Sequence, residues 1–465
     1  MLHTNVETWS DYTFGQCELG DKRRTQRLVK VASGLAGHIG QSLVKSCTTE
    51  SEIEGGYRLL RNKEVNSHAI AAGGFRATAA LAVATDNRLL ALEDSTSLSF
   101  KHSVRDSLGP VGTDPDSRRQ GLMAHSVLLI DAKIKQTVGL IEQSRWIRPV
   151  KAHGKKHRRK QRAYEDKESI KWEQASQAMS ERLGSVMERT ISVCDRESDI
   201  YEYLTYKHTQ QQRFIVRAAQ DRRIEESTAR RLFEFTGQLQ GVGRYCIPIP
   251  QKGGRKARMA EMEISYAPVT LLPPKNKVSG SPTLSLTVVQ CCEITTHKGE
   301  GLHWILLTQE PIESVAQARQ IVHYYEQGWR IEEFHLAWKS GGAQVEKQRM
   351  QTVDNLERMA VILAFVAVRL LQMREIVIDK AQAKQVPCTQ LLQAVEWQVL
   401  WLKCKHRRLP STPPSLYWAY YALAKLGKWY DSKRTGKVGW TALWEGWFKL
   451  QHLVEGAELA ASLTQ

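Results

Sequence analysis

The sequence has few of the features that would anchor a protein in a membrane, a disulfide framework or a structural zinc site. None of its eight cysteines forms a CxxC pair or a Cys/His ligand spacing. The longest apolar run, MAVILAFVAV at 359–368, is too short to cross a bilayer and predicts a buried core helix. The first residues show no basic stretch followed by an apolar one, so no secretory signal is indicated. We therefore expect a cytoplasmic protein with free thiols and no membrane partner.

Acidic residues are also fewer than basic ones. The 49 Asp and Glu residues stand against 66 Lys and Arg residues, which gives a formal net charge of +17. Such an excess favours a polyanionic partner, most often nucleic acid, although a solubilising surface is the simpler alternative. Seven of the twelve positions in 151–162 are Lys or Arg. We interpret this run as a loop that follows DNA phosphates, with a solvated loop as the alternative.

The patterning along the chain predicts an α/β protein with helical parts at both ends. Strand-like and helix-like stretches alternate between about 86 and 220, which indicates an α/β core. The stretch 222–303 is β-rich and broken by Gly, Pro, Lys and Asn clusters, and we expect it to be an insertion. The predicted domains are a helical unit at 1–70, a catalytic domain at 71–370 and a helical unit at 371–465.

The N-terminal unit carries a basic helix face. Asp21 is a plausible N-cap, and Arg23, Arg27 and Lys30 recur at i, i+4 and i+7 after it. Arg58 follows in a second helical stretch. For the first helix alone, a solvated basic face would be the better explanation, but the two groups together make a DNA-binding unit plausible.

Three acidic residues have a setting suited to metal-dependent chemistry. Asp94 lies where an apolar strand is expected to end, Asp195 ends the expected strand TISVCD directly before a helix, and Glu332 lies in a stretch of helical period. Carboxylates from two strand ends and one helix can hold a pair of Mg²⁺ ions roughly 4 Å apart. Strand-end aspartates are more often caps, however, and helical glutamates are usually solvated. The spacing alone does not select these three residues.

The surrounding motifs do select them, through a resemblance. The stretches ALEDSTSLS, SVCDRESDI, YEQGWRIEEFHLAWKSG and DNLERMAVILAFVAVRLLQ resemble those of the insertion-sequence-four family of DDE transposases. DSKRTGKVGWTALWEGWFKLQ near the C-terminus extends the likeness to the transposon-five branch of that family. The resemblance implies an RNase H-like (retroviral-integrase) catalytic core, an N-terminal DNA-binding domain, a β-insertion and a C-terminal dimerisation domain. It makes Asp94, Asp195 and Glu332 the DDE triad, which binds two Mg²⁺ ions, with Mn²⁺ as a substitute.

The resemblance also implies the reaction. Members of this family of bacterial mobile elements bind the terminal inverted repeats of double-stranded DNA and nick one strand at each end. In this branch the freed 3′-hydroxyl forms a hairpin, which water opens before the end joins target DNA. No nucleotide cofactor is needed. The family works as a homodimer in which each subunit binds one end and cuts the other, and the apolar stripe at 440–450 is the candidate contact, unless it packs within one subunit.

The family signature around the glutamate has one departure in this chain. Tyr325, Glu332 and Lys339 match its spacing, but Gly328 occupies the position of an arginine. Arg330 is then the candidate that supplies the missing guanidinium to a phosphate. Gly328 also predicts a break in the helix.

Further residues are assigned to DNA by the same resemblance. His335 lies at i+3 from Glu332, on one helix face with Lys339, and is expected near the metal ions. Trp304 matches the position that stacks a flipped base, although a tryptophan at a strand start is usually part of the core. Arg217 and Lys101 match positions that touch the DNA backbone.

Two other functions remain open from the sequence. An RNase H-like nuclease or resolvase would use the same carboxylates to cut DNA without joining it. A catalytically inactive relative would bind DNA as a repressor, although the presence of all three carboxylates argues against this alternative.

Overall fold

A computed structural model defines most of the chain. It describes residues 5–112, 119–149, 162–249, 257–275, 281–294, 301–377, 380–405, 408–430, 432 and 438–463. The basic run at 151–162 lies outside the described residues, except for Arg162.

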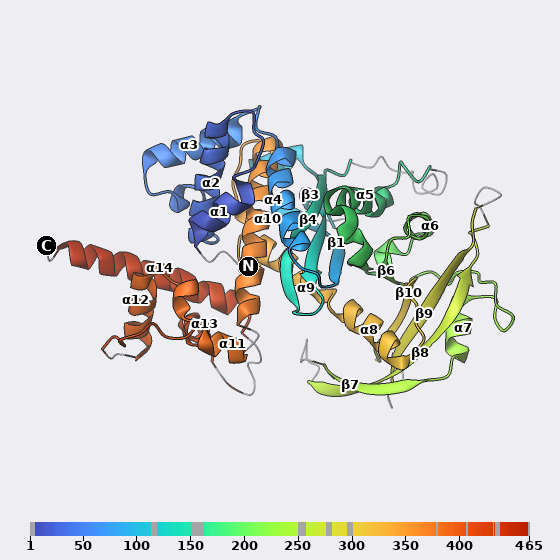
Figure 1. Cartoon of the computed structure of the whole chain (residues 1–465). Coiled ribbons are helices and arrows are strands. Elements are labelled where there is room, and N and C mark those ends of the chain that lie inside the picture. The colour runs from blue at the N-terminus through green and yellow to red at the C-terminus, as the bar shows by residue number, and fades with distance from the viewer. Residues whose placement is uncertain are drawn as a thin grey trace.

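One mixed sheet of ten strands organises the molecule (Figure 1). Its order is β2-β3-β1-β5-β6-β10-β9-β8-β7, and β4 pairs with β3. Only β1, β5 and β6 run parallel to one another, and the other pairs are antiparallel. The strands are β1 Leu89–Phe100, β2 Gly109–Pro110, β3 Gln120–Asp131, β4 Gln136–Trp146, β5 Thr190–Cys194, β6 Phe214–Arg217, β7 Gly243–Ile249, β8 Arg258–Leu271, β9 Leu284–Glu293 and β10 His303–Thr308.

Helices pack on both faces of this sheet and extend beyond one end of it, so the α/β class predicted from the sequence is confirmed. The helices are α1 Val6–Phe14, α2 Lys22–Gly37, α3 Glu50–Arg61, α4 Ser67–Val83, α5 Lys171–Leu183, α6 Tyr201–Thr209, α7 Leu232–Gln238, α8 Val315–Glu326, α9 Trp329–Leu336, α10 Val353–Ile376, α11 Lys380–Gln385, α12 Ala394–Lys405, α13 Leu416–Leu426 and α14 Trp440–Leu463.

Alternate side chains of β1 enter different cores, as the pleat of a strand requires. Leu90 and Leu92 belong to the large core that includes α10, whereas Leu89 and Ala91 pack in a smaller core with α5. The strand is therefore covered by helices on both faces. A charged side chain on either face needs a partner or an opening to solvent.

The apolar run at 359–368 forms the centre of α10, and every residue in it is buried. The predicted core helix is therefore confirmed. Among the described residues, no helix combines the length and apolar character that crossing a membrane requires.

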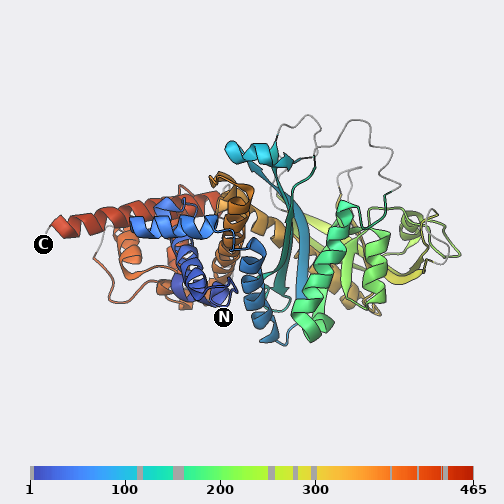
Figure 2. The same ribbon diagram turned by 90° about the horizontal axis from the view of Figure 1, so that it is seen from above.

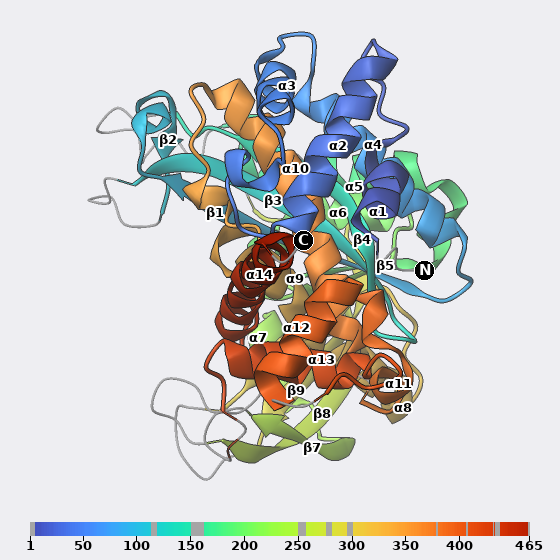
Figure 3. The same ribbon diagram turned by 90° about the vertical axis from the view of Figure 1, so that its left-hand side faces the viewer.

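The two helical parts lie on the side of α10 away from the sheet. Figures 2 and 3 show α1–α3 and α11–α14 gathered there, with the end of α14 projecting from the rest. Asp21 caps α2, as predicted, by accepting from the Arg23 backbone N–H. The apolar stripe of α14 is buried within the single chain, so it packs inside the subunit.

The strand that carries Asp94 differs from the sequence prediction. We expected it to end near Glu93 and Asp94, but β1 continues to Phe100. β3 pairs with β1 along its whole length, whereas β5 pairs only with Leu89–Glu93. The apolar pattern stops where β5 ends. The backbone continues as a strand because β3 still satisfies its hydrogen bonds.

The β-rich stretch extends the same sheet. β7, β8 and β9 follow one another in antiparallel pairs, β9 pairs with β10, and β10 pairs with β6 of the central strands. The insertion is thus joined to the core by backbone hydrogen bonds. The domain boundaries themselves remain a prediction.

The packing of α4 against β4 depends on one glycine. A Cβ atom at Gly139 would lie 2.4 Å from Thr78 Oγ1 and 3.0 Å from Thr78 Cβ. We expect Gly139→Ala to lower the free energy of unfolding by about 1–3 kcal/mol, because the helix must move off the strand. Urea unfolding measures this effect.

Gly237→Ala is the matched control, because nothing lies within 4 Å of a Cβ atom there. Gly237 lies in α7, so alanine should raise the stability by up to about 1 kcal/mol. Equal effects of the two substitutions would contradict the close-contact argument.

Candidate active site

The parallel pairing of β1 and β5 brings two aspartates together. Glu93 and Cys194 form the last residue pair of this ladder, and Asp94 and Asp195 are the next residues along the two strands. Neighbouring residues in register on parallel strands share a face of the sheet. Asp94 and Asp195 are therefore neighbours across the two strands where β5 ends. The Asp195 carboxylate is not part of the group of ligand atoms, from Asp94, Glu332 and His335, that lie within 4.8 Å of one another.

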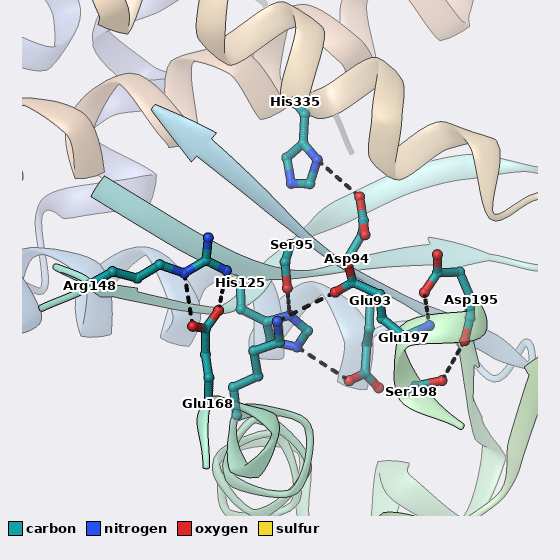
Figure 4. Close-up of polar contacts among 11 residues, drawn as sticks. Glu93, Asp94, Ser95, His125, Arg148, Glu168, Asp195, Glu197, Ser198 and His335 are labelled. Atoms are coloured by element: carbon teal, nitrogen blue, oxygen red, sulfur yellow. Dashed lines mark hydrogen bonds and ion pairs between the residues drawn. The ribbon is translucent and has the colours of Figure 1, made fainter. Parts of the chain in front are cut away.

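The backbone that follows β5 orients Asp195. This residue is the N-cap of the short 3₁₀ helix Arg196–Ser198, and its Oδ1 accepts from the Glu197 backbone N–H at 2.8 Å (Figure 4). The Ser198 hydroxyl donates to the Asp195 carbonyl at 2.7 Å. A short carboxylate held by its own turn has little rotational freedom.

Helix α9 adds two further ligand-type side chains. One potential ligand atom each from Asp94, Glu332 and His335 lies within 4.8 Å of the others. His335 Nδ1 is 3.5 Å from Asp94 Oδ2 (Figure 4). The imidazole is buried, and its Nε2 has no hydrogen-bond partner among the described residues. Hydrogen-bonding capacity is therefore left unused beside the carboxylates.

The electrostatics of this cluster favour a cation. Desolvation of the carboxyl, followed by the negative charge of Asp94, raises the pKa of Glu332 above its ordinary value. Desolvation and the Asp94 charge also raise the pKa of Asp195, although the Glu197 N–H opposes this shift. Like charges held this close are destabilising until a cation or a proton neutralises them. Carboxylate oxygens are the ligands that Mg²⁺ and Mn²⁺ prefer, so the residues present fit such ions.

Lys339 lies beside this cluster, although the helix geometry changes before it. The predicted break at Gly328 is confirmed, since α8 ends at Glu326 and α9 begins at Trp329. Residues Ala337–Gly341 form a π-helical turn. Lys339 Nζ donates to Thr96 Oγ1 at 3.3 Å, two residues along β1 from Asp94. A positive charge is thus held on the edge of the acidic cluster.

An aromatic and basic patch lies next to the Asp195 side. The rings of Trp304 in β10 and Tyr325 in α8 meet nearly edge to face, with centroids 5.6 Å apart. Arg217 in β6 donates to the His303 carbonyl at 3.0 Å. Burial raises the pKa of the Tyr325 hydroxyl, and the positive charge of Arg217 lowers it. The three residues assigned separately to DNA therefore form one patch.

Two residues assigned to DNA lie elsewhere. Arg330 Nη1 is 3.3 Å from Glu375 Oε1 in α10, and both side chains are largely buried. Its guanidinium therefore pairs with a protein carboxylate, and its expected phosphate contact stays a prediction. Lys101 directly follows β1, and seven residues of strand put it about 23 Å from Asp94.

The N-terminal basic residues lie on α2 and α3. Arg23 pairs with Asp21, Arg27 packs over Gly55, and Arg58 pairs with Glu54. Lys30 is exposed. The side chains of Arg23 and Arg58 are 89% and 75% exposed, so both can reach a phosphate with little rearrangement.

A buried charged network behind the aspartates was missed by the sequence reasoning. The Glu93 side chain is fully buried, and its Oε2 is 3.8 Å from His125 Nε2 (Figure 4). The Ser95 hydroxyl is 3.0 Å from His125 Nδ1, and Lys207 Nζ donates to Ser192 Oγ at 2.9 Å. Burial alone would raise the pKa of Glu93, but His125 and the Lys207 charge lower it. The only available signal was Glu93 itself, an acid inside an apolar strand.

Comparison with known families gives one finding. Residues 6–65 match the family model for transposase DNA-binding, a span that covers α1, α2 and α3. The match supports a DNA-binding transposase, and thus a DNA-cutting enzyme with DNA as its partner. It confirms the prediction of an N-terminal DNA-binding unit in this part of the chain.

The raised pKa values predict how stability depends on pH and metal. The folded protein holds protons on Asp195 and Glu332 more tightly than the unfolded chain does. Without metal, the free energy of unfolding therefore falls as the pH rises from about 4, the unfolded-state pKa of these groups, through their raised pKa values in the folded protein. We expect Asp195→Asn to raise the unfolding temperature at pH 7 in EDTA, measured by calorimetry.

Added Mg²⁺ should reverse this difference, so that the original protein has the higher unfolding temperature. At one hundred times its Kd, the ion should stabilise the original protein by about 2.7 kcal/mol and the variant far less. Asp166→Asn, at an exposed position, is the control and should change neither behaviour. An Asp195→Asn protein that is destabilised in EDTA would contradict the electrostatic argument.

Proposed function

We propose that this protein is a cut-and-paste DNA transposase of the insertion-sequence-four family, close to the transposon-five branch. It binds the terminal inverted repeats of its element, nicks them, forms and opens hairpin ends, and joins the 3′-hydroxyls to target DNA. The observation that carries this proposal is the carboxylate pair on neighbouring parallel strands, faced by Glu332 of α9, in a chain whose first helices match a transposase DNA-binding family.

The strand order supports an RNase H-like catalytic core. β4, β3 and β1 are antiparallel neighbours, and β5 and β6 continue the sheet parallel to β1. Helices cover both faces. The proposed triad then comes from the central strand, the end of its parallel neighbour and a helix across the site.

Asp94, Asp195 and Glu332 would hold two Mg²⁺ ions, with Mn²⁺ as a substitute. When bound, such ions activate the attacking water or 3′-hydroxyl and stabilise the leaving oxygen. Asp195 is prepared for this role by its capping turn. Desolvation and, after it, the Asp94 charge raise the pKa values of Asp195 and Glu332, and a bound cation would offset both effects.

The chain's own residues position the DNA strand. Lys339, held at Thr96, offers its ammonium to a phosphate beside the carboxylates. His335 has hydrogen-bonding capacity left for the same phosphate or a water. Trp304 and Tyr325 offer a half-buried aromatic surface for an unstacked base in the hairpin, worth roughly 1–3 kcal/mol per base. Arg217 stands beside them for the backbone.

End recognition belongs to α2 and α3 in this proposal, through Arg23, Arg27, Lys30 and Arg58. A homodimer would let each subunit bind one end and cut the other. Because the apolar stripe of α14 is buried within the subunit, the exposed last turns of α14 at 455–463 are the better candidate for the dimer contact.

Cleavage of the element's own ends is the main test. We expect the purified protein with Mg²⁺ to nick and join DNA that carries its terminal inverted repeats. Asp195→Ala and Glu332→Ala should each lower the cleavage rate by more than roughly 100-fold, which is the upper end of the loss typical when a residue next to a metal ligand is replaced. Both variants should still bind the DNA ends. Gel-based cleavage and strand-transfer assays measure both steps.

The outcomes of this test separate the possible functions. Cleavage without strand transfer would identify a nuclease or resolvase, and end binding without cleavage would identify an inactive repressor. Wild-type cleavage by Asp195→Ala would falsify the assignment of the triad.

The salt dependence of DNA binding tests the N-terminal helices. If Arg58 neutralises one phosphate, Arg58→Ala should reduce the slope of log K against log salt by about 0.9. The affinity should fall on every DNA sequence alike. Fluorescence anisotropy over a salt series measures the slope. Lys133→Ala, at an exposed position in the β3–β4 turn, is the control and should leave the slope unchanged.

A further inference from the structure

The two charged residues that flank Glu332 in α9, Arg330 and Glu333, form ion pairs with α10. Arg330 Nη1 lies 3.3 Å from Glu375 Oε1, and Arg374 Nη1 donates to Glu333 Oε1 at 3.0 Å. Two consecutive residues of α10 therefore hold α9 on either side of Glu332. We call these four residues the α9 clamp.

Helix α9 is short and has irregular backbone at both ends. It spans eight residues, with the break at Gly328 before it and the π-helical turn after it. A Cβ atom at Gly328 would lie 2.9 Å from the Tyr325 carbonyl, so the break leaves little room for a larger residue. A helix this short is marginal alone and takes its orientation from tertiary contacts.

Apolar packing holds α9 against the core, but it restrains the rotation of α9 about its own axis less strongly. Ile331 and Phe334 are buried, and the Phe334 ring stacks on Trp338, whose Nε1 donates to the Ala360 carbonyl at 3.0 Å. Apolar burial is non-directional. The Arg374–Glu333 contact is a hydrogen bond between charged groups, which is directional and roughly twice as strong as a neutral one. The Arg330–Glu375 contact is an ion pair between largely buried groups. Together the two contacts restrain which way Glu332 points.

The α10 side of the clamp is itself anchored. The buried Glu375 carboxylate accepts from the Thr137 backbone N–H at 2.6 Å and from its hydroxyl at 2.7 Å. The Arg374 guanidinium lies 4.6 Å from the ring centroid of Trp440, the first residue of α14, and its charge lowers the pKa of Tyr420 in α13, which burial raises. The clamp thus connects α9 to β4 on one side and to the C-terminal helices on the other.

We propose that Arg330, Glu333, Arg374 and Glu375 are positioning residues that orient Glu332 toward Asp94 for metal binding. Arg330 has this role in place of the phosphate contact inferred from the sequence, because moving it to DNA would leave Glu375 buried and unpaired. The inference rests on the proposed function, since it assigns the clamp to the metal site of that function.

The test measures metal affinity without DNA, so that cleavage is not the only readout. Free Mn²⁺ is followed by electron paramagnetic resonance during titration of the full chain. Glu333→Gln removes one charge at a partly exposed position. We expect it to weaken Mn²⁺ binding by about 10–100-fold, with the unfolding temperature and the affinity for DNA ends nearly unchanged. Glu375→Gln is a second variant and should act in the same direction.

A charge reversal separates positioning from general stability. Glu333→Arg should bind Mn²⁺ more weakly than Glu333→Gln, because two guanidinium groups then repel each other. Adding Arg374→Glu should recover much of the lost affinity. The matched control is Glu310→Gln, which breaks the comparably buried Arg213–Glu310 pair at the end of β10 and should leave Mn²⁺ binding unchanged.

The possible failures are distinguishable. If Asp195→Ala abolishes Mn²⁺ binding while Glu333→Gln and Glu375→Gln bind as tightly as the original protein, the clamp is wrong and the proposed function stands. The same holds if Glu310→Gln weakens binding as much as Glu333→Gln. If Asp195→Ala itself binds Mn²⁺ normally, the metal site of the proposed function is wrong, and the role proposed for the clamp is wrong as well.

Discussion

The rest of the site depends on how β1 pairs with its two neighbours. β3 holds β1 along its full length, but β5 stops opposite Glu93. Asp94 and Asp195 therefore emerge together at the one point where the parallel ladder ends and solvent can enter. A shift of one residue in this register would turn Asp94 to the opposite face. The backbone ladder is thus the element that makes two distant aspartates into a pair.

The opposite face of β1 carries a buried carboxylate. Glu93 precedes Asp94 and its side chain is fully buried, with the His125 ring and the Lys207 charge near it. Removing either partner would leave a buried carboxylate uncompensated, at several kcal/mol. This network and the acidic cluster lie on opposite faces of β1. One face of the strand therefore carries the buried Glu93 network, and the other carries Asp94.

The third carboxylate reaches the site by a different physical route. Glu332 lies on a short helix between a break and a π-helical turn, and side-chain contacts with α10, rather than a backbone ladder, set its orientation. Arg374 also touches Trp440 of α14. One side chain of α10 therefore contacts both Glu333 of α9 and the first residue of α14.

The sequence by itself determined the local features of this protein. The Asp21 cap, the buried run of α10, the break at Gly328 and the α/β alternation all follow from residues close together in the chain. Only the tertiary structure decided that β1 runs on to Phe100 and that Arg330 pairs with Glu375. Both outcomes depend on partners far along the chain, a β3 ladder and an α10 carboxylate, and no local pattern encodes which distant group will satisfy a backbone or a charge.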